Sequence, residues 1–183
     1  DDQTDFAAEV QAIADNNCGS IVMVSYSTDG AAILETMAVA GISLPTFGAD
    51  GIADAAFLDD FSVPAIANGV TATKPRAGSS AGDFNERCAA NADCAGGIYT
   101  AEAFDAMIIM GYSVFAQLSS PGATLSQMIG AVGQGFVGAS GVHSFLANGD
   151  VPGSGYCVGT FVVVGGVPDF DCSRSWTLSG GVE

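Results

Sequence analysis

A strand, a helix and a second strand follow one another near the N-terminus, and this pattern constrains the fold of the chain most. Residues 20–25 (SIVMVS) form an apolar, β-branched run that is typical of a buried strand. Residues 30–40 have a helical pattern, and residues 42–47 form a short strand in which Pro45 favours the sheet edge or the start of the strand. A βαβ unit places its strands parallel in one sheet, so the sequence predicts an α/β fold.

The carboxyl ends of these two strands are the best candidates for a ligand site. In open parallel sheets, ligands bind beyond the carboxyl ends of the strands. The first strand leads into Tyr26, Ser27 and Thr28, and the second leads into Asp50 and Gly51. Ordinary structural roles are open as well, because Ser27 or Thr28 could cap the following helix and Asp50 before Gly51 is a common turn pair.

Further elements follow from apolar periodicity. A helix is expected to run from Thr4, a possible N-cap, to about residue 16, and Thr124 is expected to cap another helix. Residues 100–118 carry an apolar stripe broad enough for a well-buried helix. Near the C-terminus, residues 156–164 and 167–172 predict an antiparallel hairpin.

The cysteines predict local disulfides. Cys88 and Cys94 bracket a short polar loop, and Cys157 and Cys172 flank the predicted hairpin. Two local disulfides in an oxidising compartment are therefore expected. Cys18 is left over, and it is either buried and inert or paired with something outside this chain.

The charge balance excludes several classes of partner. Four basic residues against twenty acidic ones give a formal net charge of -16, so nucleic acid and anionic membranes are poor partners. We expect no membrane span, because no uninterrupted apolar run reaches about 18 residues. We also expect no signal peptide in the given sequence, because its first residues do not form a cationic and apolar leader.

Motifs that would suggest catalysis, a cofactor or a metal have simpler explanations. Residues 133–138 (GQGFVG) spell GxGxxG but follow a helix rather than a strand, so a helix stop and a flexible turn are expected instead of a dinucleotide site. The sole histidine, His143, lies in an apolar strand without ligands at metal spacing, which favours a hydrogen-bonded structural histidine. No nucleophile elbow accompanies it. We therefore predict no enzymatic activity, no cofactor and no metal site.

Six short sequence segments, taken in their order along the chain, resemble those of a known protein family. They are residues 5–6 (DF), 24–34 (VSYSTDGAAIL), 44–51 (LPTFGADG), 69–75 (GVTATKP), 103–106 (AFDA), and 141–150 with 156–161 (GVHSFLANGD and YCVGTF). Together they resemble the type I periplasmic solute-binding proteins of ABC transporters, in the branched-chain amino-acid (Leu/Ile/Val)-binding family. Full members of that family are much longer, so the chain resembles their C-terminal half only.

The resemblance implies βαβ lobes with parallel sheets, incomplete relative to the family, and a C-terminal antiparallel hairpin. Residues 1–73 would be part of the second, C-terminal lobe. Residues 74–150 would be part of the first lobe after a crossover, and residues 151–183 would return to the second lobe as a strand and hairpin.

The resemblance also implies roles for the residues at the strand ends. Tyr26 matches an aromatic position that helps to enclose the ligand, and Asp50 matches the carboxylate that receives the ligand's α-ammonium group. Such a charge-assisted hydrogen bond is about twice as strong as a neutral one. Ser27 and Thr28 could add hydroxyl or backbone contacts beside it, and Gly51 belongs to the same loop as Asp50.

The function implied is that of a periplasmic or extracellular protein that captures an amino acid or a related small polar ligand for an ABC permease. An alternative is the same fold as the ligand-sensing domain of a receptor. A third possibility is a structural or interaction protein, in which this half packs with a missing N-terminal half or with itself.

Overall fold

The structure, a computed structural model, describes residues 5–75, 82–92, 94, 99–151, 155–165, 167–177 and 180–182. The chain forms two compact units. Unit 1 comprises residues 1–74, 157–176 and 180–183, and unit 2 comprises residues 75–156 and 177–179. Whether these units correspond to the two predicted lobes stays a prediction.

Unit 1 is built mainly from a sheet with short helices. Its elements are α1 (Ala7–Asp15), β1 (Ile21–Met23), α2 (Ser27–Val39), β2 (Thr46–Gly48), the 3-10 turns η1 (Asp50–Ile52), η2 (Ala55–Asp60) and η3 (Pro64–Ala67), β3 (Thr71–Pro75), β6 (Tyr156–Val164), β7 (Val167–Thr177) and β8 (Gly181–Val182). Unit 2 contains α3 (Gly82–Ala89), α4 (Thr100–Leu118), α5 (Leu125–Val132), β4 (Phe136–Gly138) and β5 (Gly141–His143).

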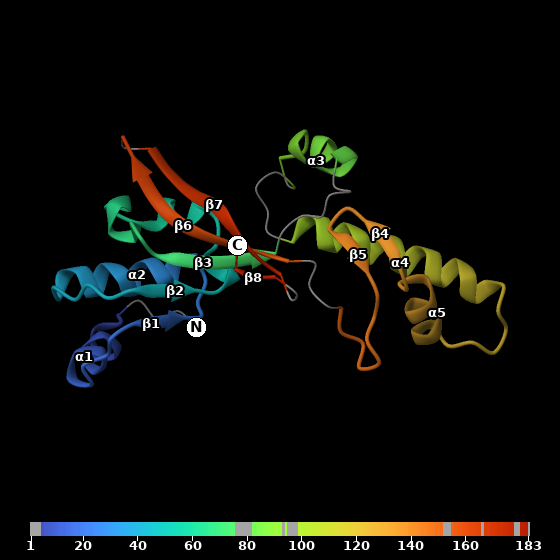
Figure 1. Cartoon of the computed structure of the whole chain (residues 1–183), viewed down its shortest axis with the longest axis horizontal. Coiled ribbons are helices and arrows are strands. Elements are labelled where there is room, and N and C mark those ends of the chain that lie inside the picture. Colours follow the sequence, from blue (N-terminus) through green and yellow to red (C-terminus); the bar gives the residue numbers. More distant parts are fainter. Residues whose placement is uncertain are drawn as a thin grey trace. The chain divides into compact units, whose positions relative to one another are not determined.

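The sheet of unit 1 confirms the predicted α/β fold. Its strand order is β1-β2-β3-β6-β7-β8, and β1, β2 and β3 are parallel (Figure 1). Val22 lies opposite Phe47 in the register of β1 and β2, and α2 connects these two strands as predicted. Because β6 and β7 follow one another across residues 165–166 and are neighbours in the sheet, they form the expected C-terminal hairpin.

Aromatic packing holds the sheet to its covering turns. Phe57 and Phe161 are fully buried, with ring centroids 5.0 Å apart, and Phe161 also lies 4.8 Å from the ring of Phe170. A side chain at Gly159 would overlap the Phe170 ring, so glycine is required there for this packing. The core thus joins the C-terminal strands to the N-terminal βαβ unit, which fixes the carboxyl ends of β1 and β2.

The prediction that residues 20–25 form a buried strand is wrong in part. Only residues 21–23 form β1, and its side chains alternate between two faces. Met23 is buried in the core, whereas Val22 is 78% exposed and Val24 just beyond the strand is 84% exposed. The strand is first in the sheet order, and only one of its faces meets the core.

The prediction that residues 100–118 form a well-buried helix is also wrong in part. The helix α4 exists, but its buried stripe consists of small and polar residues with one isoleucine: Ala101, Asp105, Ile109 and Ser113. Their spacing of four places them on one side, and α4 packs against α5. Larger apolar side chains, including Met107, Phe115 and Leu118, are 70% or more exposed.

The helix starts are partly as expected. Thr124 caps α5 in a capping box, in which its hydroxyl accepts the Gln127 N–H and the Gln127 side chain accepts the Thr124 N–H. Thr4 lies outside the described residues. The Asp5 carboxylate instead accepts the N–H of Ala7, the first residue of α1, at 2.9 Å.

Both predicted disulfides are present. Cys88–Cys94 closes the loop after α3, with the two Cα atoms 5.1 Å apart, and Cys157–Cys172 joins β6 to β7 across 5.6 Å. Cys18 is free and exposed, so the alternative that it is buried and inert is wrong, and the alternative that it pairs with something outside this chain stays a prediction.

Candidate functional site

A pocket of about 410 Å³ lies at the carboxyl ends of β1 and β2 in unit 1. Its lining is formed by Phe6, Val24, Ser25, Tyr26, Asp29, Ile33, Ala49, Asp50 and Gly51. Three of the residues predicted from sequence, Tyr26, Asp50 and Gly51, are therefore brought together. The other two, Ser27 and Thr28, do not line this pocket and form the first turn of α2. We call this cavity the strand-end pocket.

The position of Tyr26 follows from the transition between β1 and α2. Its backbone is extended, and its carbonyl oxygen accepts the first helical hydrogen bond, from the Gly30 N–H at 2.9 Å. Tyr26 is thus the N-cap residue, and no side chain caps α2, so the interpretation of Ser27 or Thr28 as a cap is wrong. The backbone is held by the helix while the side chain is 80% exposed, which leaves the phenol ring accessible to a ligand.

Gly51 has a packing role in this pocket. A Cβ atom at this position would overlap the carbonyl oxygen of Ser25. The missing side chain therefore lets η1, which begins at Asp50, approach the end of β1 closely. The N–H of Ala49 donates to the Met23 carbonyl at 3.0 Å and fixes the same loop to the strand. Together these contacts place the Asp50 backbone beside Tyr26.

The pocket lining is anionic. Asp29 and Asp50 contribute carboxylates, and the lining contains no lysine or arginine. Carboxylates at the rim of a concave site raise the local concentration of cations. The hydroxyl of Ser25 is buried against Gly30, where it has no hydrogen-bond partner in the described part of the chain, so the charge of the lining comes from the two carboxylates. The pocket therefore suits a ligand with a positively charged donor group.

Sequence reasoning missed Asp29 and Ser25. Asp29 lies in the first turn of α2, where an acidic residue is common because it complements the helix dipole. Ser25 is the last residue of the predicted strand and carried no signal of its own. Both lie within three residues of Tyr26. The whole segment from Ser25 to Asp29, rather than single residues in it, therefore predicts the lining of the pocket.

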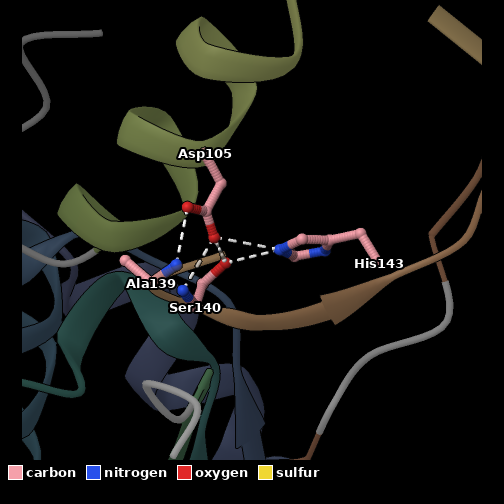
Figure 2. A network of polar contacts seen from close by, with 4 residues as sticks. All are labelled: Asp105, Ala139, Ser140 and His143. Atoms are coloured by element: carbon pink, nitrogen blue, oxygen red, sulfur yellow. Dashed lines mark hydrogen bonds and ion pairs between the residues drawn. The ribbon is translucent and has the colours of Figure 1, made fainter. Parts of the chain in front are cut away.

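A second polar cluster lies in unit 2 around Asp105, which is 2% exposed (Figure 2). One carboxylate oxygen of Asp105 accepts the Ala139 N–H at 2.7 Å. The other accepts the Ser140 N–H at 2.7 Å and the Ser140 hydroxyl at 2.6 Å, and it lies 3.0 Å from His143 Nε2. The carboxylate thus fastens α4 to the turn between β4 and β5. We call these residues the Asp105 cluster.

The pKa of Asp105 lies below its ordinary value. Burial on its own would raise the pKa, but the hydrogen bonds from the Ser140 side chain and backbone, from the Ala139 N–H and from His143 outweigh it. The carboxylate is therefore ionised at neutral pH, and it can accept all of these hydrogen bonds at once.

The Asp105 cluster contains serine, histidine and aspartate but lacks the geometry of a catalytic triad. In a triad, one ring nitrogen of the histidine faces the carboxylate and the other faces the serine. Here His143 Nε2 lies 3.0 Å from Asp105 and 2.9 Å from the Ser140 hydroxyl, so the same nitrogen faces both. Ser140 is buried and donates its proton to Asp105. The prediction that His143 is hydrogen-bonded within the protein is confirmed.

The glycines of the GxGxxG stretch serve packing. A side chain at Gly138 would overlap the Asp105 carboxylate, and one at Gly133 would overlap the Phe145 ring. Gly133 ends α5 as expected, but Phe136–Gly138 form β4, which pairs antiparallel with β5 rather than continuing as a turn. Within the described residues, no cluster of histidine, cysteine and carboxylate groups could hold a metal ion.

No protein-family model matches the chain. No curated protein matches its sequence either. In the part of the chain that the structure describes, every helix is too short or too polar to cross a membrane.

Solved structures match the fold. The leucine-binding protein LivK of Thermotoga maritima has a TM-score of 0.72 at 18% sequence identity, over 93% of this chain and 48% of that one. The substrate-binding protein LivJ of Streptococcus pneumoniae, solved with isoleucine, has a TM-score of 0.65 at 17% identity, over 91% and 47%. A solute-binding protein of R. palustris, solved with benzoate, has a TM-score of 0.67 at 12% identity, over 92% and 46%.

The chain thus spans about half the length of the solved structures that it matches. These similarities confirm the predicted fold, part of a type I periplasmic binding protein, as found in substrate-binding proteins of branched-chain amino-acid ABC transporters. At such low identities they establish the fold and leave the ligand to be argued from the residues of this chain.

Proposed function

We propose that the chain is the ligand-binding part of an extracytoplasmic solute-binding protein, which captures an amino acid or a related small amine for an ABC permease without altering it chemically. The observation that carries this proposal is the strand-end pocket, where Tyr26, Asp29 and Asp50 line one cavity. The two disulfides support an oxidising, extracytoplasmic compartment.

The charge of the pocket favours amines over simple acids. The ammonium group of a ligand would donate to Asp50, and its side chain would lie against the Tyr26 ring. A charged hydrogen bond contributes about 1.5–3 kcal/mol. Benzoate, which one structural neighbour binds, carries only a carboxylate and would meet two carboxylates here without a compensating basic side chain.

The pocket is open on one side, since Tyr26 is 80% exposed. Small-molecule sites usually bury about 70–90% of their ligand. The chain on its own should therefore bind weakly, with a Kd on the order of 1 mM, or about −4 kcal/mol.

Chemical-shift titration by NMR suits such weak binding. The ligands are leucine, leucinamide, which keeps the amine but lacks the carboxylate, and 4-methylpentanoate, which keeps the carboxylate but lacks the amine. We expect leucine and leucinamide to shift the resonances of Tyr26 and Asp50 saturably. We expect 4-methylpentanoate to leave them unchanged.

The matched pair of variants is Asp50→Asn and Asp59→Asn. Asp59 is exposed and does not line the pocket, so its variant should bind leucinamide as the wild type does. Asp50→Asn should weaken binding about tenfold or more, because it removes a charged hydrogen-bond acceptor. Saturable binding of 4-methylpentanoate but not of leucinamide would contradict the proposal.

A further inference from the structure

Unit 2 contains a cavity of about 280 Å³ directly over the Asp105 cluster. Its lining includes three buried residues, each 4% exposed or less: Asp105, Ile109 and Ser140. Phe145 and Tyr156 contribute aromatic surface to its wall. The volume is close to the lower end of the usual range for small-molecule sites, about 300–1,000 Å³. We call it the unit 2 cavity.

The hydrogen bonds of the cluster assign the protons of His143. The Ser140 hydroxyl donates its single proton to Asp105, so its oxygen can only accept from His143 Nε2. The ionised Asp105 carboxylate also requires a donor at Nε2. In its neutral form the ring therefore carries its proton on Nε2 and presents a lone pair at Nδ1, which no described residue approaches as a hydrogen-bond partner.

The wall also contains an acidic residue, Glu102. Glu102 lies three residues before Asp105 on α4, hence on the same side of the helix, and it lines the cavity together with His143. The lining contains no lysine or arginine. The cavity therefore offers two acceptors, a carboxylate and an imidazole lone pair, together with the Tyr156 residue, whose phenol can donate or accept, next to apolar and aromatic surface.

We propose that the unit 2 cavity is a second binding site, specific for a small primary amine with a compact apolar body. The ammonium group would donate to the Glu102 carboxylate and to His143 Nδ1, and the apolar body would lie against Ile109 and Phe145. Anions are disfavoured, because Glu102 and the ionised Asp105 both repel them in a largely apolar cavity. This site is separate from the strand-end pocket and does not depend on its function.

The sole histidine provides a direct readout. Two-dimensional ¹H–¹⁵N NMR of the imidazole reports both ring nitrogens of His143 without overlap from other histidines. The probes are benzylamine, benzyl alcohol and benzoate, each titrated at constant pH and ionic strength. We expect benzylamine to shift the Nδ1 resonance saturably while Nε2 keeps its proton. We expect benzyl alcohol to bind at least tenfold more weakly, and benzoate to cause no saturable shift.

Three conservative variants complete the experiment. Glu102→Gln should weaken benzylamine binding about tenfold or more, since it removes a charged acceptor. Glu86→Gln is the control, because Glu86 is exposed on α3 and does not line the cavity. Asp50→Asn should leave the benzylamine shift of Nδ1 unchanged, which separates this site from the strand-end pocket. Absence of a saturable Nδ1 shift, equal binding of benzoate, or an unaffected Glu102→Gln variant would each overturn the proposal.

Discussion

The strand-end pocket of unit 1 and the Asp105 cluster of unit 2 both centre on an aspartate, but they place it in opposite surroundings. Asp105 is 2% exposed and accepts hydrogen bonds from two backbone N–H groups, a hydroxyl and an imidazole. Asp50 lines an open pocket beside a tyrosine that is 80% exposed. The first carboxylate is enclosed by its own chain, whereas the second belongs to a partly buried residue that lines an open pocket.

This difference separates a structural carboxylate from a binding one. A buried carboxylate whose acceptor sites are filled by the protein stabilises the fold and has little capacity left for a ligand. A carboxylate that lines an open pocket can contribute a charged hydrogen bond to a ligand on binding. Substitutions in the two regions should therefore have opposite effects on stability and on binding.

The largest effect is expected from Asp105→Ala. It leaves the N–H groups of Ala139 and Ser140 and the side chains of Ser140 and His143 without their common acceptor, in a buried place. Breaking a buried charged network in this way typically costs about 3–5 kcal/mol. Urea unfolding of the chain measures the loss. A destabilisation no larger than that of an average surface substitution would show that Asp105 does not fasten α4 to the β4–β5 turn.

Gly138→Ala should cost less, about 1–3 kcal/mol, as expected for overpacking. The added Cβ atom would meet the Asp105 carboxylate, so that α4 or the β4–β5 turn has to move. The matched control is Gly130→Ala, since a Cβ atom there meets nothing and alanine favours helix. Thermal unfolding distinguishes the two, and equal melting temperatures would contradict the close approach of Gly138 to Asp105.

The pH dependence of stability gives a smaller, graded effect. The pKa of Asp105 is lower in the folded chain than its ordinary value of 3.8, so folding favours the ionised form. The resulting stabilisation is fully present above the ordinary pKa and is lost as the pH falls through the folded value. Urea unfolding measured from about pH 5 downward should show this loss, since unfolded aspartates titrate near 3.9. The slope should be shallower for Asp105→Asn, and identical slopes would contradict the assignment.

The smallest effect on stability is expected from Asp50→Asn. Asp50 is only partly buried, so its substitution should change stability less than substitutions in the Asp105 cluster, on the order of 0.5 kcal/mol. The same substitution should weaken the binding of leucinamide about tenfold or more, because it removes the charged acceptor of the ligand's ammonium group. Urea unfolding and NMR titration of one sample measure both quantities. A large loss of stability with unchanged binding would reverse the roles assigned to Asp50 and Asp105.

Sequence reasoning located the strand-end pocket because parallel topology brings neighbouring strand ends together. Tyr26 and Asp50 follow successive strands of one βαβ unit, and the topology alone places them at one edge of the sheet. The sequence did not show which side chains of β1 are exposed. Val22 and Val24 are apolar, as in a strand buried on both faces, and yet both are exposed. Composition indicates a strand, whereas exposure depends on which layers cover the strand.

The Asp105 cluster could not be predicted in the same way. Asp105 and Ser140 lie 35 residues apart, and no periodic pattern connects them. His143 was expected to be hydrogen-bonded, but its partners follow only from the packing of α4 against the β4–β5 turn. The exposed stripe of α4 was missed for a related reason. Phe115 and Leu118 continue an apolar pattern whose buried side is occupied by smaller residues.

The most direct test of the strand-end pocket measures where a bound amine lies. Intermolecular nuclear Overhauser effects arise only between protons that lie close together. They therefore report which side chains of the pocket lining contact the bound leucinamide. We predict contacts from the leucinamide methyl groups to the rings of Tyr26 and Phe6, and their loss in Asp50→Asn. Saturable binding of leucinamide without any contact to Tyr26, or contacts that persist unchanged in Asp50→Asn, would contradict the account.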